Sequence, residues 1–396
     1  MLIPELDWIT ALQNRVHKIF HRLAKNHEIH VIYFEHEQRE IKKSYRLKNN
    51  IVLHKPPTLF MKNMLMFYFL NAFSIYSYLN RLIRTYKIQI IVTTNFLFAP
   101  FAIRAARKNS IPIVFDLVDF QPYHINYITY FPSILKNLGN SLLTSVLNYD
   151  ISHADYVITT GLPLFQYIRR KEIKNVTIIS NGVDNTLFNS SHDGRIIQKK
   201  YNIAPPIICF VGAMEYWINY PQIFHTISLL QEEFPLLHCL FIGPSRHYGI
   251  NKIKQMAAQF NILKHITFTG RIPYRQLPSF ICASDLCILP FVKNYLTHCV
   301  IPMKLFEYLA CGRPVASVSL AGVKSIAQNA IFYADTPFEL RDRIRYILTN
   351  KQKINEKILL GKSLVKNYSW EDLTHKYEEV LQQTYSKCYM KIKNKK

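Results

Sequence analysis

The strongest constraint on the fold is the regular alternation of short apolar runs with helical segments. In the first half, strands are expected at 29–34, 88–93, 111–117, 154–160 and 176–179, and helices at 10–26, 59–86, 98–109, 132–149 and 163–171. Strands that alternate with helices form a parallel sheet covered by helices on both faces. Only residues 1–6 could supply a strand ahead of the first helix, so either that strand is very short or the start codon is misplaced.

The same alternation restarts after a polar segment, which predicts a second domain. Residues 189–206 contain Ser, Asn, Asp, Gly and two prolines but few large apolar side chains, as is typical of a domain boundary. Further strands are expected at 207–211, 236–242, 266–268, 286–289, 315–318 and 331–333. We therefore expect an α/β protein with doubly wound domains at 1–190 and 207–368 and a linker at 191–206. The apolar stripe of a last helix, 369–390, favours packing on the protein's own core over membrane binding.

The net charge indicates classes of partner without choosing among them. A formal charge of +23 favours a membrane surface, nucleic acid or phosphorylated small molecules. No nucleic-acid-binding signature accompanies the charge, so we expect no nucleic-acid partner. The most lipophilic stretch, 64–79, is shorter than the roughly 20 residues needed to cross a bilayer. It is expected to form a buried or membrane-touching helix.

The cysteines favour a reducing, cytoplasmic environment. Their number, seven, is odd, and none of them forms a C-x-x-C pair. Such a pattern fits free thiols better than a disulfide framework. No zinc-type ligand spacing is present, so no metal site is predicted. The amino terminus also lacks the basic and apolar regions of a secretory signal.

Residues 302–315 predict a helix, a turn and a buried strand, with an anion site where the helix begins. Pro302 suits the first helical position, and Gly312 suits the position after the helix, where the backbone often turns left-handed. A helix that starts beyond a strand end, here after a loop at 291–301, favours a phosphate. Lys304 and Glu307 share one side of this helix and could hold a phosphate and a nearby hydroxyl. The alternative is a surface ion pair.

Three glycines directly follow successive predicted strands of the second domain, namely Gly212, Gly243 and Gly270. Glycine lets a loop turn sharply or approach a ligand closely. Because ligands lie beyond the carboxyl ends of parallel strands, these glycines predict that the binding site occupies this edge of the sheet.

A long motif, N-x-L-T…P-x-K-x-x-E-Y-L-A-x-G-x-P-V, runs through 294–315. It reads here as Asn294, Leu296, Thr297, Pro302, Lys304, Glu307, Tyr308, Leu309, Ala310, Gly312, Pro314 and Val315. With the N-G-V-D turn at 181–184, the G-x-x-P-Y segment at 270–274 and the W-E pair at 370–371, it resembles the family-4-like (group 1) glycosyltransferases. The resemblance implies a GT-B fold, in which two Rossmann-like domains face a cleft and the last helix crosses back to the amino-terminal, acceptor-binding domain.

The resemblance also implies roles for individual residues. Glu307 would hold the ribose hydroxyls of the donor, and Lys304 with the helix start at Met303 would hold its diphosphate without a metal. Other implied donor-binding residues are Tyr295 and Thr297 near the phosphates or sugar, Gly212 and Gly243 on the strand edge, and Arg271 and Ile272 near the base. The implied reaction moves a hexose-type sugar from a UDP- or GDP-sugar, with no further cofactor, to a lipid-linked, polysaccharide or glycoprotein glycan acceptor.

Two departures from the family pattern leave the stereochemistry open. Retaining members often carry a carboxylate at the position of Cys299, and many carry a basic pair in the segment that here reads 212–220 without Lys or Arg. The segment resembles that of inverting, membrane-associated members. An inverting enzyme needs a base for the acceptor hydroxyl. Asp119 is the candidate, with Asp116 and His124 as rivals, although Asp119 could instead close a loop.

The aromatic loop 118–130 and the apolar stretch 59–80 predict where an acceptor would dock. Aromatic faces stack on sugars or lie at a lipid interface, and the basic charge favours peripheral contact with an anionic membrane at its cytoplasmic face. The alternative for these side chains is the protein core. A non-catalytic GT-B scaffold protein is the competing function, because the carboxylate and the basic pair are missing.

Overall fold

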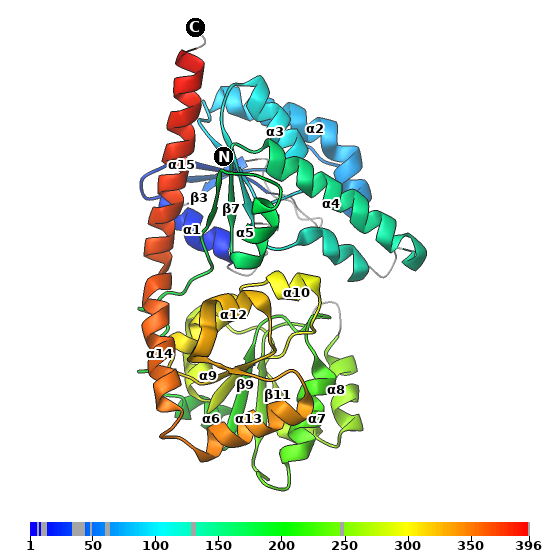
Figure 1. The fold of residues 1–396 in the computed structure, drawn as a ribbon, viewed down its shortest axis with the longest axis vertical. Coiled ribbons are helices and arrows are strands. Elements are labelled where there is room, and N and C mark those ends of the chain that lie inside the picture. Colours follow the sequence, from blue (N-terminus) through cyan, green and yellow to red (C-terminus); the bar gives the residue numbers. More distant parts are fainter. Residues whose placement is uncertain are drawn as a thin grey trace. The chain divides into compact units, whose positions relative to one another are not determined.

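The chain divides into two compact units. The computed structural model describes residues 1–5, 8, 14–33, 44–47, 50–59, 64–127, 132–245 and 249–394. One unit combines Met1–Ser180 with Trp370–Lys396, and the other is Asn181–Ser369 (Figure 1). Parts of the predicted segments, at 10–13, 34, 60–63 and 128–130, lie outside the described residues.

The first unit is built on an eight-stranded sheet in the order β3-β4-β2-β1-β5-β6-β7-β8. Its strands are β1 (Leu2–Ile3), β2 (Ile29–Ile32), β3 (Ser44–Leu47), β4 (Ile51–His54), β5 (Ile91–Thr93), β6 (Ile113–Leu117), β7 (Tyr156–Thr159) and β8 (Val176–Ile178). All neighbours are parallel except β3 and β4, an antiparallel pair that the sequence did not predict. The short first strand is present, and its two residues are fully buried between β2 and β5.

Helices cover this sheet in the predicted alternation. They are α1 (Arg15–Leu23), α2 (Met64–Thr85), α3 (Ala99–Lys108), α4 (Lys136–His153), α5 (Leu162–Arg169) and the long α15 (Trp370–Lys393). Helices α2, α3 and α4 lie side by side, and α1 packs against α15 (Figure 1). The predicted loop 118–130 is partly helical, because η1 (Gln121–Tyr127) forms a 3₁₀ helix there.

A buried polar triad fixes α15 to the first unit. Arg15 on α1 forms an ion pair with Asp116 on β6, with 3.3 Å between Nε and Oδ2, and donates through Nη1 to the carbonyl of Ser180. Tyr377 on α15 donates its hydroxyl to the same carboxylate at 3.2 Å. Since charge pairs in the interior are costly to break, the triad ties the last helix to the centre of the sheet.

The second unit contains a fully parallel six-stranded sheet in the order β11-β10-β9-β12-β13-β14. Its strands are β9 (Ile207–Val211), β10 (His238–Ile242), β11 (Ile266–Phe268), β12 (Leu286–Leu289), β13 (Val315–Ser317) and β14 (Phe332–Tyr333). Its α-helices are α6 (Arg195–Tyr201), α7 (Tyr220–Leu230), α8 (Ile250–Gln259), α9 (Leu277–Cys282), α10 (Tyr295–Cys299), α11 (Met303–Ala310), α12 (Ala321–Ala327), α13 (Pro337–Thr349) and α14 (Asn355–Val365). Shorter 3₁₀ turns occur at η2 (Ser133–Leu135) in the first unit and, in the second, at η3 (Leu263–His265), η4 (Tyr274–Gln276), η5 (Gln328–Ala330) and η6 (Lys366–Tyr368).

The predicted linker 191–206 is wrong. This segment carries α6, whose Ile197 is buried in the core of the second unit. A side chain added at Gly194 would place its Cβ 2.4 Å from Cα of Ala283, so the segment packs tightly against α9. The division between the units falls earlier, between Ser180 and Asn181. Polar composition signalled a boundary there, but a short amphipathic helix needs only a few apolar side chains to join a core.

Candidate functional site

Helix α11 begins at the carboxyl edge of the second sheet. Pro302 is its N-cap and has extended backbone angles, φ −74° and ψ 133°, so the helix starts one residue later than predicted. No side chain caps this end among the described residues. The helix terminates as expected, with Gly312 at a φ of 65°. Uncapped N–H groups and the helix dipole together favour an anion.

Lys304 lies in the first turn of α11, and its ammonium group lies in an apolar environment next to two aromatic rings. Its Nζ lies 4.3 Å from the ring centroid of Phe210 and 5.4 Å from that of Phe291. Burial lowers the pKa of Lys304 to about 8, although the charge of Glu307 raises it in part. A desolvated cation interacts strongly with an anion that replaces its lost water.

The three glycines expected at one edge do meet there. Gly212 and Gly243 have φ values of 138° and 141°, which only glycine adopts readily. A Cβ at Gly212 would lie 2.3 Å from Nζ of Lys304, and one at Gly243 would lie 2.1 Å from the carbonyl oxygen of Gly212. The N–H of Gly243 donates to the carbonyl of Gly270 at 3.0 Å. The loops after β9, β10 and β11 therefore pack backbone against backbone beside the lysine.

Glu307 is held by a residue whose role the motif did not reveal. Its side chain is nearly buried, at 4% exposed, and Oε1 accepts a hydrogen bond from the hydroxyl of Tyr274 at 3.1 Å. Tyr274 belongs to the G-x-x-P-Y segment and packs edge-on against Phe188 at 5.2 Å between ring centroids. The neighbouring Tyr308 accepts from the N–H of Val211 at 2.7 Å, which fixes α11 to the end of β9.

The loop expected at 291–301 contains helix α10 instead. Asn294 caps it by accepting from the N–H of Thr297, whose hydroxyl is hydrogen-bonded to the carbonyl of Val292 at 2.6 Å. Thr297 is buried, so its visible role is to shape this loop. Tyr295 is exposed, and Cys299 is buried.

The remaining predicted donor residues lie at the start of α11 and in the loop between β11 and η4. Met303 is half-buried at the start of α11. Ile272 is half-buried against the core, while Arg271 beside it is exposed.

In the first unit, a polar cluster gathers where β1, β5 and β6 end. The N–H of Glu5 donates to the hydroxyl of Thr94 at 2.8 Å, and the amide of Gln121 donates to the carbonyl of Thr94 at 3.0 Å. Gln121 also hydrogen-bonds the carboxyl group of Glu5. Its Oε1 is buried and has no partner among the described residues. Asp119 completes the cluster at the end of β6.

Burial and mutual repulsion separate the acidities of the two carboxyl groups. Burial raises the pKa of Asp119 to about 6. Burial and, secondly, the Asp119 charge raise the pKa of Glu5 to about 8. At neutral pH Asp119 is therefore mostly ionised while Glu5 keeps its proton. Glu5 was not a predicted site residue, since a single acidic residue near the amino terminus forms no recognisable motif.

The rivals of Asp119 differ in their surroundings. Asp116 is wrong as a base candidate, because its carboxylate is buried and already engaged by Arg15 and Tyr377. His124 is half-buried in η1, where burial lowers its pKa. A neutral imidazole can accept a proton, so its chemistry remains compatible with a base.

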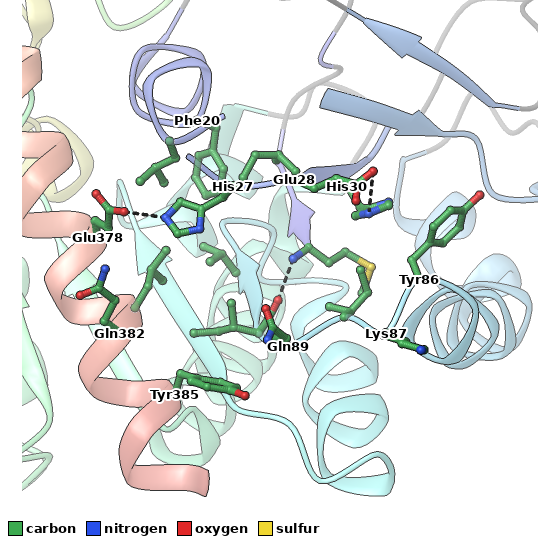
Figure 2. A pocket seen from close by; sticks show the side chains of 17 residues that line it. Phe20, His27, Glu28, His30, Tyr86, Lys87, Gln89, Glu378, Gln382 and Tyr385 are labelled. Carbon is green, nitrogen blue, oxygen red and sulfur yellow. Dashed lines mark hydrogen bonds and ion pairs between the residues drawn. The ribbon is translucent and has the colours of Figure 1, made fainter. Parts of the chain in front are cut away.

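A groove of about 280 Å³ in the first unit lies at the opposite edge of the sheet. Met1, Ile29 and Ile90, at or next to the amino ends of β1, β2 and β5, line it together with α15 (Figure 2). His27 and Glu378 form an ion pair on one side, at 2.5 Å between Nε2 and Oε1. Because ligands of open α/β sheets lie beyond the carboxyl ends of the strands, this groove is not the expected acceptor site.

Comparison with known proteins identifies both units. The family model "Glycosyltransferase Family 4" matches residues 12–187, and "Glycosyl transferases group 1" matches residues 205–350. TuaH of Bacillus subtilis, a glycosyltransferase named for teichuronic acid biosynthesis, is 24% identical over 206 residues, 50% of this chain and 49% of that protein. The chain thus matches about half the length of TuaH. The uncharacterised glycosyltransferase MJ1178 of Methanocaldococcus jannaschii is 23% identical over 94% of both chains.

Solved structures share the fold. Sucrose-phosphate synthase from Thermosynechococcus elongatus superposes with a TM-score of 0.78 and 14% identity, covering 97% of this chain and 98% of that one. Alr3699/HepE from Anabaena, solved with UDP and glucose, gives a TM-score of 0.74 at 14% identity over 96% and 99%. These similarities confirm the predicted GT-B fold. Since the two family models cover both units in order, the chain is a family-4-like glycosyltransferase of the GT-B fold.

Proposed function

We propose that the unit Asn181–Ser369 binds a UDP-hexose as the sugar donor. The observation that carries this proposal is the pairing of Lys304 with Gly212 at the uncapped start of α11. A buried ammonium group, free helix N–H groups and a side-chain-free backbone form a site for a diphosphate. The HepE structures contain UDP or UDP-glucose, which supports a uridine donor over a guanosine one.

Each donor group has a proposed partner. Lys304 and the N–H groups of the first turn of α11, from Met303 onward, bind the diphosphate. Glu307, oriented by Tyr274, accepts from the ribose hydroxyls. Arg271 and the backbone of Ile272 lie by the base, and the exposed Tyr295 covers the sugar. Thr297 contributes by shaping α10, and Gly243 by supporting Gly212.

Calorimetric titration with UDP, and with GDP for comparison, tests the donor site. Lys304→Ala and Glu307→Ala should each weaken UDP binding about 10- to 100-fold, because a hydrogen bond to a charged group contributes about 1.5–3 kcal/mol. Lys264→Ala is the matched control, since this exposed lysine in η3 precedes β11 and so lies at the other edge of the sheet. Unchanged UDP binding in both site variants would refute the assignment. Binding of GDP more tightly than UDP would instead indicate a guanosine nucleotide as the donor.

We further propose that Asp119 is the base of an inverting transfer. Asp119 takes the proton of the acceptor hydroxyl, the freed oxygen bonds to the anomeric carbon, and the bond to the diphosphate breaks so that UDP leaves with the electron pair. A carboxylate whose pKa is raised to about 6 stays mostly ionised at pH 7 and is a better base than an ordinary aspartate. Lys304 and the start of α11 would stabilise the leaving diphosphate.

Hydrolysis of UDP-glucose, with water as the acceptor, tests the base without knowledge of the natural acceptor. Asp119→Asn should bind UDP normally and lose about 100-fold or more in hydrolysis rate. NMR of the first product should show β-glucose, the inverted anomer. Release of α-glucose would instead indicate retention, and full activity of Asp119→Asn would favour His124. Absence of hydrolysis and transfer by the wild type would favour the non-catalytic scaffold.

We propose a cell-envelope glycan or its lipid-linked precursor as the acceptor, at the cytoplasmic face of the membrane. TuaH is named for teichuronic acid biosynthesis, and the structurally similar WaaG is described as involved in lipopolysaccharide biosynthesis. No helix of the described residues is long and apolar enough to cross a bilayer. Transfer of labelled sugar from UDP-hexose into the solvent-extractable lipid of a membrane fraction would support a lipid-linked acceptor, and label only in soluble glycan would exclude it.

A further inference from the structure

Helix α2 exposes large apolar side chains in its first half. Phe69 and Phe73, one turn apart, are 79% and 78% exposed. Met66, which precedes them, and Leu70, which lies between them, are also exposed. In the second half of the helix the apolar side chains are buried instead, as Leu79, Leu82 and Ile83 show. An isolated exposed apolar residue is ordinary, but two phenylalanines on one helical stripe are not.

The segment that leads into α4 repeats this arrangement. Ile134 in η2 is 87% exposed, and Leu138 and Leu142 on α4 are 60% and 59% exposed. Further along the same helix, Leu147 and Ile151 are buried. In both helices the most exposed apolar side chains therefore lie in the first half, although Phe67 on α2 is buried and Tyr149 near the end of α4 is 40% exposed.

The position of these stripes relates them to the polar cluster at Asp119. Helix α2 follows β4 and α4 follows β6, so the first half of each helix lies toward the carboxyl edge of the sheet. Both helices flank α3 in one layer (Figure 1). The exposed apolar side chains therefore lie at the same edge of the first unit as Asp119 and Glu5.

The charge of this layer complements an anionic surface. Helices α2, α3 and α4 contain a single acidic residue, Asp150, which is buried. They carry six basic residues, five of them exposed: Arg81, Arg84, Arg104, Arg107, Lys108 and the half-buried Lys136. Of these, Lys136 lies beside the exposed apolar side chains, and the others give the layer a net positive charge. Exposed apolar side chains in a basic layer without exposed acids favour an anionic membrane surface.

We propose that the first halves of α2 and α4 form a two-helix docking surface for an anionic lipid bilayer. The surface is defined by Met66, Phe69, Leu70, Phe73, Ile134, Leu138 and Leu142. Phenylalanine and leucine insert among the acyl chains, Lys136 lies near the headgroups, and the positive charge of the layer attracts the anionic surface. Docking brings the carboxyl edge of the first sheet to the bilayer, where a lipid-linked acceptor would meet Asp119. Only this last consequence rests on the proposed function.

Flotation of the full chain with vesicles tests the proposal. The wild type should float with vesicles containing phosphatidylglycerol, bind them less as salt rises, and bind neutral phosphatidylcholine vesicles at least tenfold less. Phe69→Ser/Phe73→Ser and Ile134→Ser/Leu138→Ser should each lower partitioning onto anionic vesicles at least tenfold. The matched control is Leu359→Ser/Leu360→Ser on α14, where both leucines are exposed in the second unit.

The outcomes separate this surface from the enzyme's other properties. UDP binding should remain unchanged in all three double variants, which confirms that they fold and that the donor site is independent. Equal flotation of the wild type and the α2 and α4 variants would overturn the proposal, as would equal loss in the α14 control. A concentration-dependent dimer abolished by the same substitutions, without vesicle binding, would assign the surface to a second copy of the chain instead.

Discussion

At the scale of single residues, Lys304 shows how the fold changes the chemistry of a side chain. Phe210 lies on one side of its ammonium group, and Gly212 leaves the space that any other residue would fill. Burial brings the pKa to about 8, so the charge that should hold a diphosphate is present at neutral pH and disappears in mild alkali. A surface lysine would remain charged to about pH 10.

Affinity for UDP should therefore fall as the pH rises through 8. Below this pKa the ammonium ion is ready to bind, and above it binding must first take up a proton. Between pH 7 and pH 8.5 the dissociation constant, measured by calorimetry, should rise about fourfold, because the charged fraction of a group with pKa 8 falls by that factor. Lys304→Arg stays charged throughout and should lose this dependence. An unchanged slope in the arginine variant would contradict the assignment.

Asp150 is a second residue with altered chemistry, and here the alteration affects stability. Its carboxyl oxygens are buried without partners among the described residues, and burial raises its pKa to about 9. Between about pH 4 and pH 9 the folded state holds a proton that the unfolded state has lost, so stability falls as pH rises across this range.

Asp150→Asn should remove this loss of stability. Its gain in the free energy of unfolding over the wild type should grow by up to about 1.4 kcal/mol per pH unit between pH 4 and pH 9. Urea unfolding at pH 6 and pH 8 measures the effect. Asp342→Asn, at an exposed aspartate paired with Arg341, is the control and should leave the pH dependence intact. An equal stability difference at both pH values would exclude the buried carboxyl as its cause.

At the scale of elements, α15 shows how a terminal helix becomes part of a distant core. Tyr377 reaches Asp116, and Arg15 on α1 neutralises the same carboxylate. Ion pairs between Arg22 and Glu371 and between His27 and Glu378 are more exposed and should contribute less. The first half of the apolar stripe predicted for this helix is buried, as expected. The hydrogen bond of Tyr377, however, depends on Asp116, which lies more than 260 positions away in the chain.

Tyr377→Phe should loosen α15 without unfolding the second unit. Loss of one hydrogen bond to a buried carboxylate costs about 1.5–3 kcal/mol, whereas Asp116→Ala, which leaves Arg15 unpaired, should cost about 3–5 kcal/mol. Faster hydrogen exchange in α15 and a lower midpoint of urea unfolding would show both effects. Tyr385→Phe on the same helix is the control and should change neither measurement.

At the scale of the whole molecule, the two units have separate hydrophobic cores. The buried cluster of the second unit draws only on residues between Val183 and Val365, and a cluster of the first draws on residues between Met1 and Ile113. Among the described residues, each sheet is formed only by strands of its own unit. Stabilisation by a ligand should therefore be confined to the unit that binds it.

UDP at 100 times its dissociation constant should stabilise the second unit by about 2.7 kcal/mol. Hydrogen exchange followed by mass spectrometry should show the slowest amides of β9, β10 and α11 protected further, with those of β5 and β6 unchanged. Lys304→Ala at the same UDP concentration is the control. Equal protection of both units would show that they unfold together.

Local patterns determined much of this protein. The alternation of strands and helices predicted two doubly wound units, and Pro302 and Gly312 located α11 to within a residue. These features depend on residues close together in the chain, where periodicity and capping preferences act. The linker prediction failed for a related reason, because polar composition does not show whether a few apolar side chains will reach a core, as Ile197 does.

Only the tertiary structure decided which of these residues act together. It joined Tyr274 to Glu307 and placed Lys304 against Gly212. It removed Asp116 from the base candidates and placed Glu5 beside Asp119. Burial and the approach of charges set the acidity of these groups, and both depend on neighbours that are remote in sequence. The sequence alone therefore determined the class of fold and the position of helix α11, whereas the chemistry of the candidate site followed from packing.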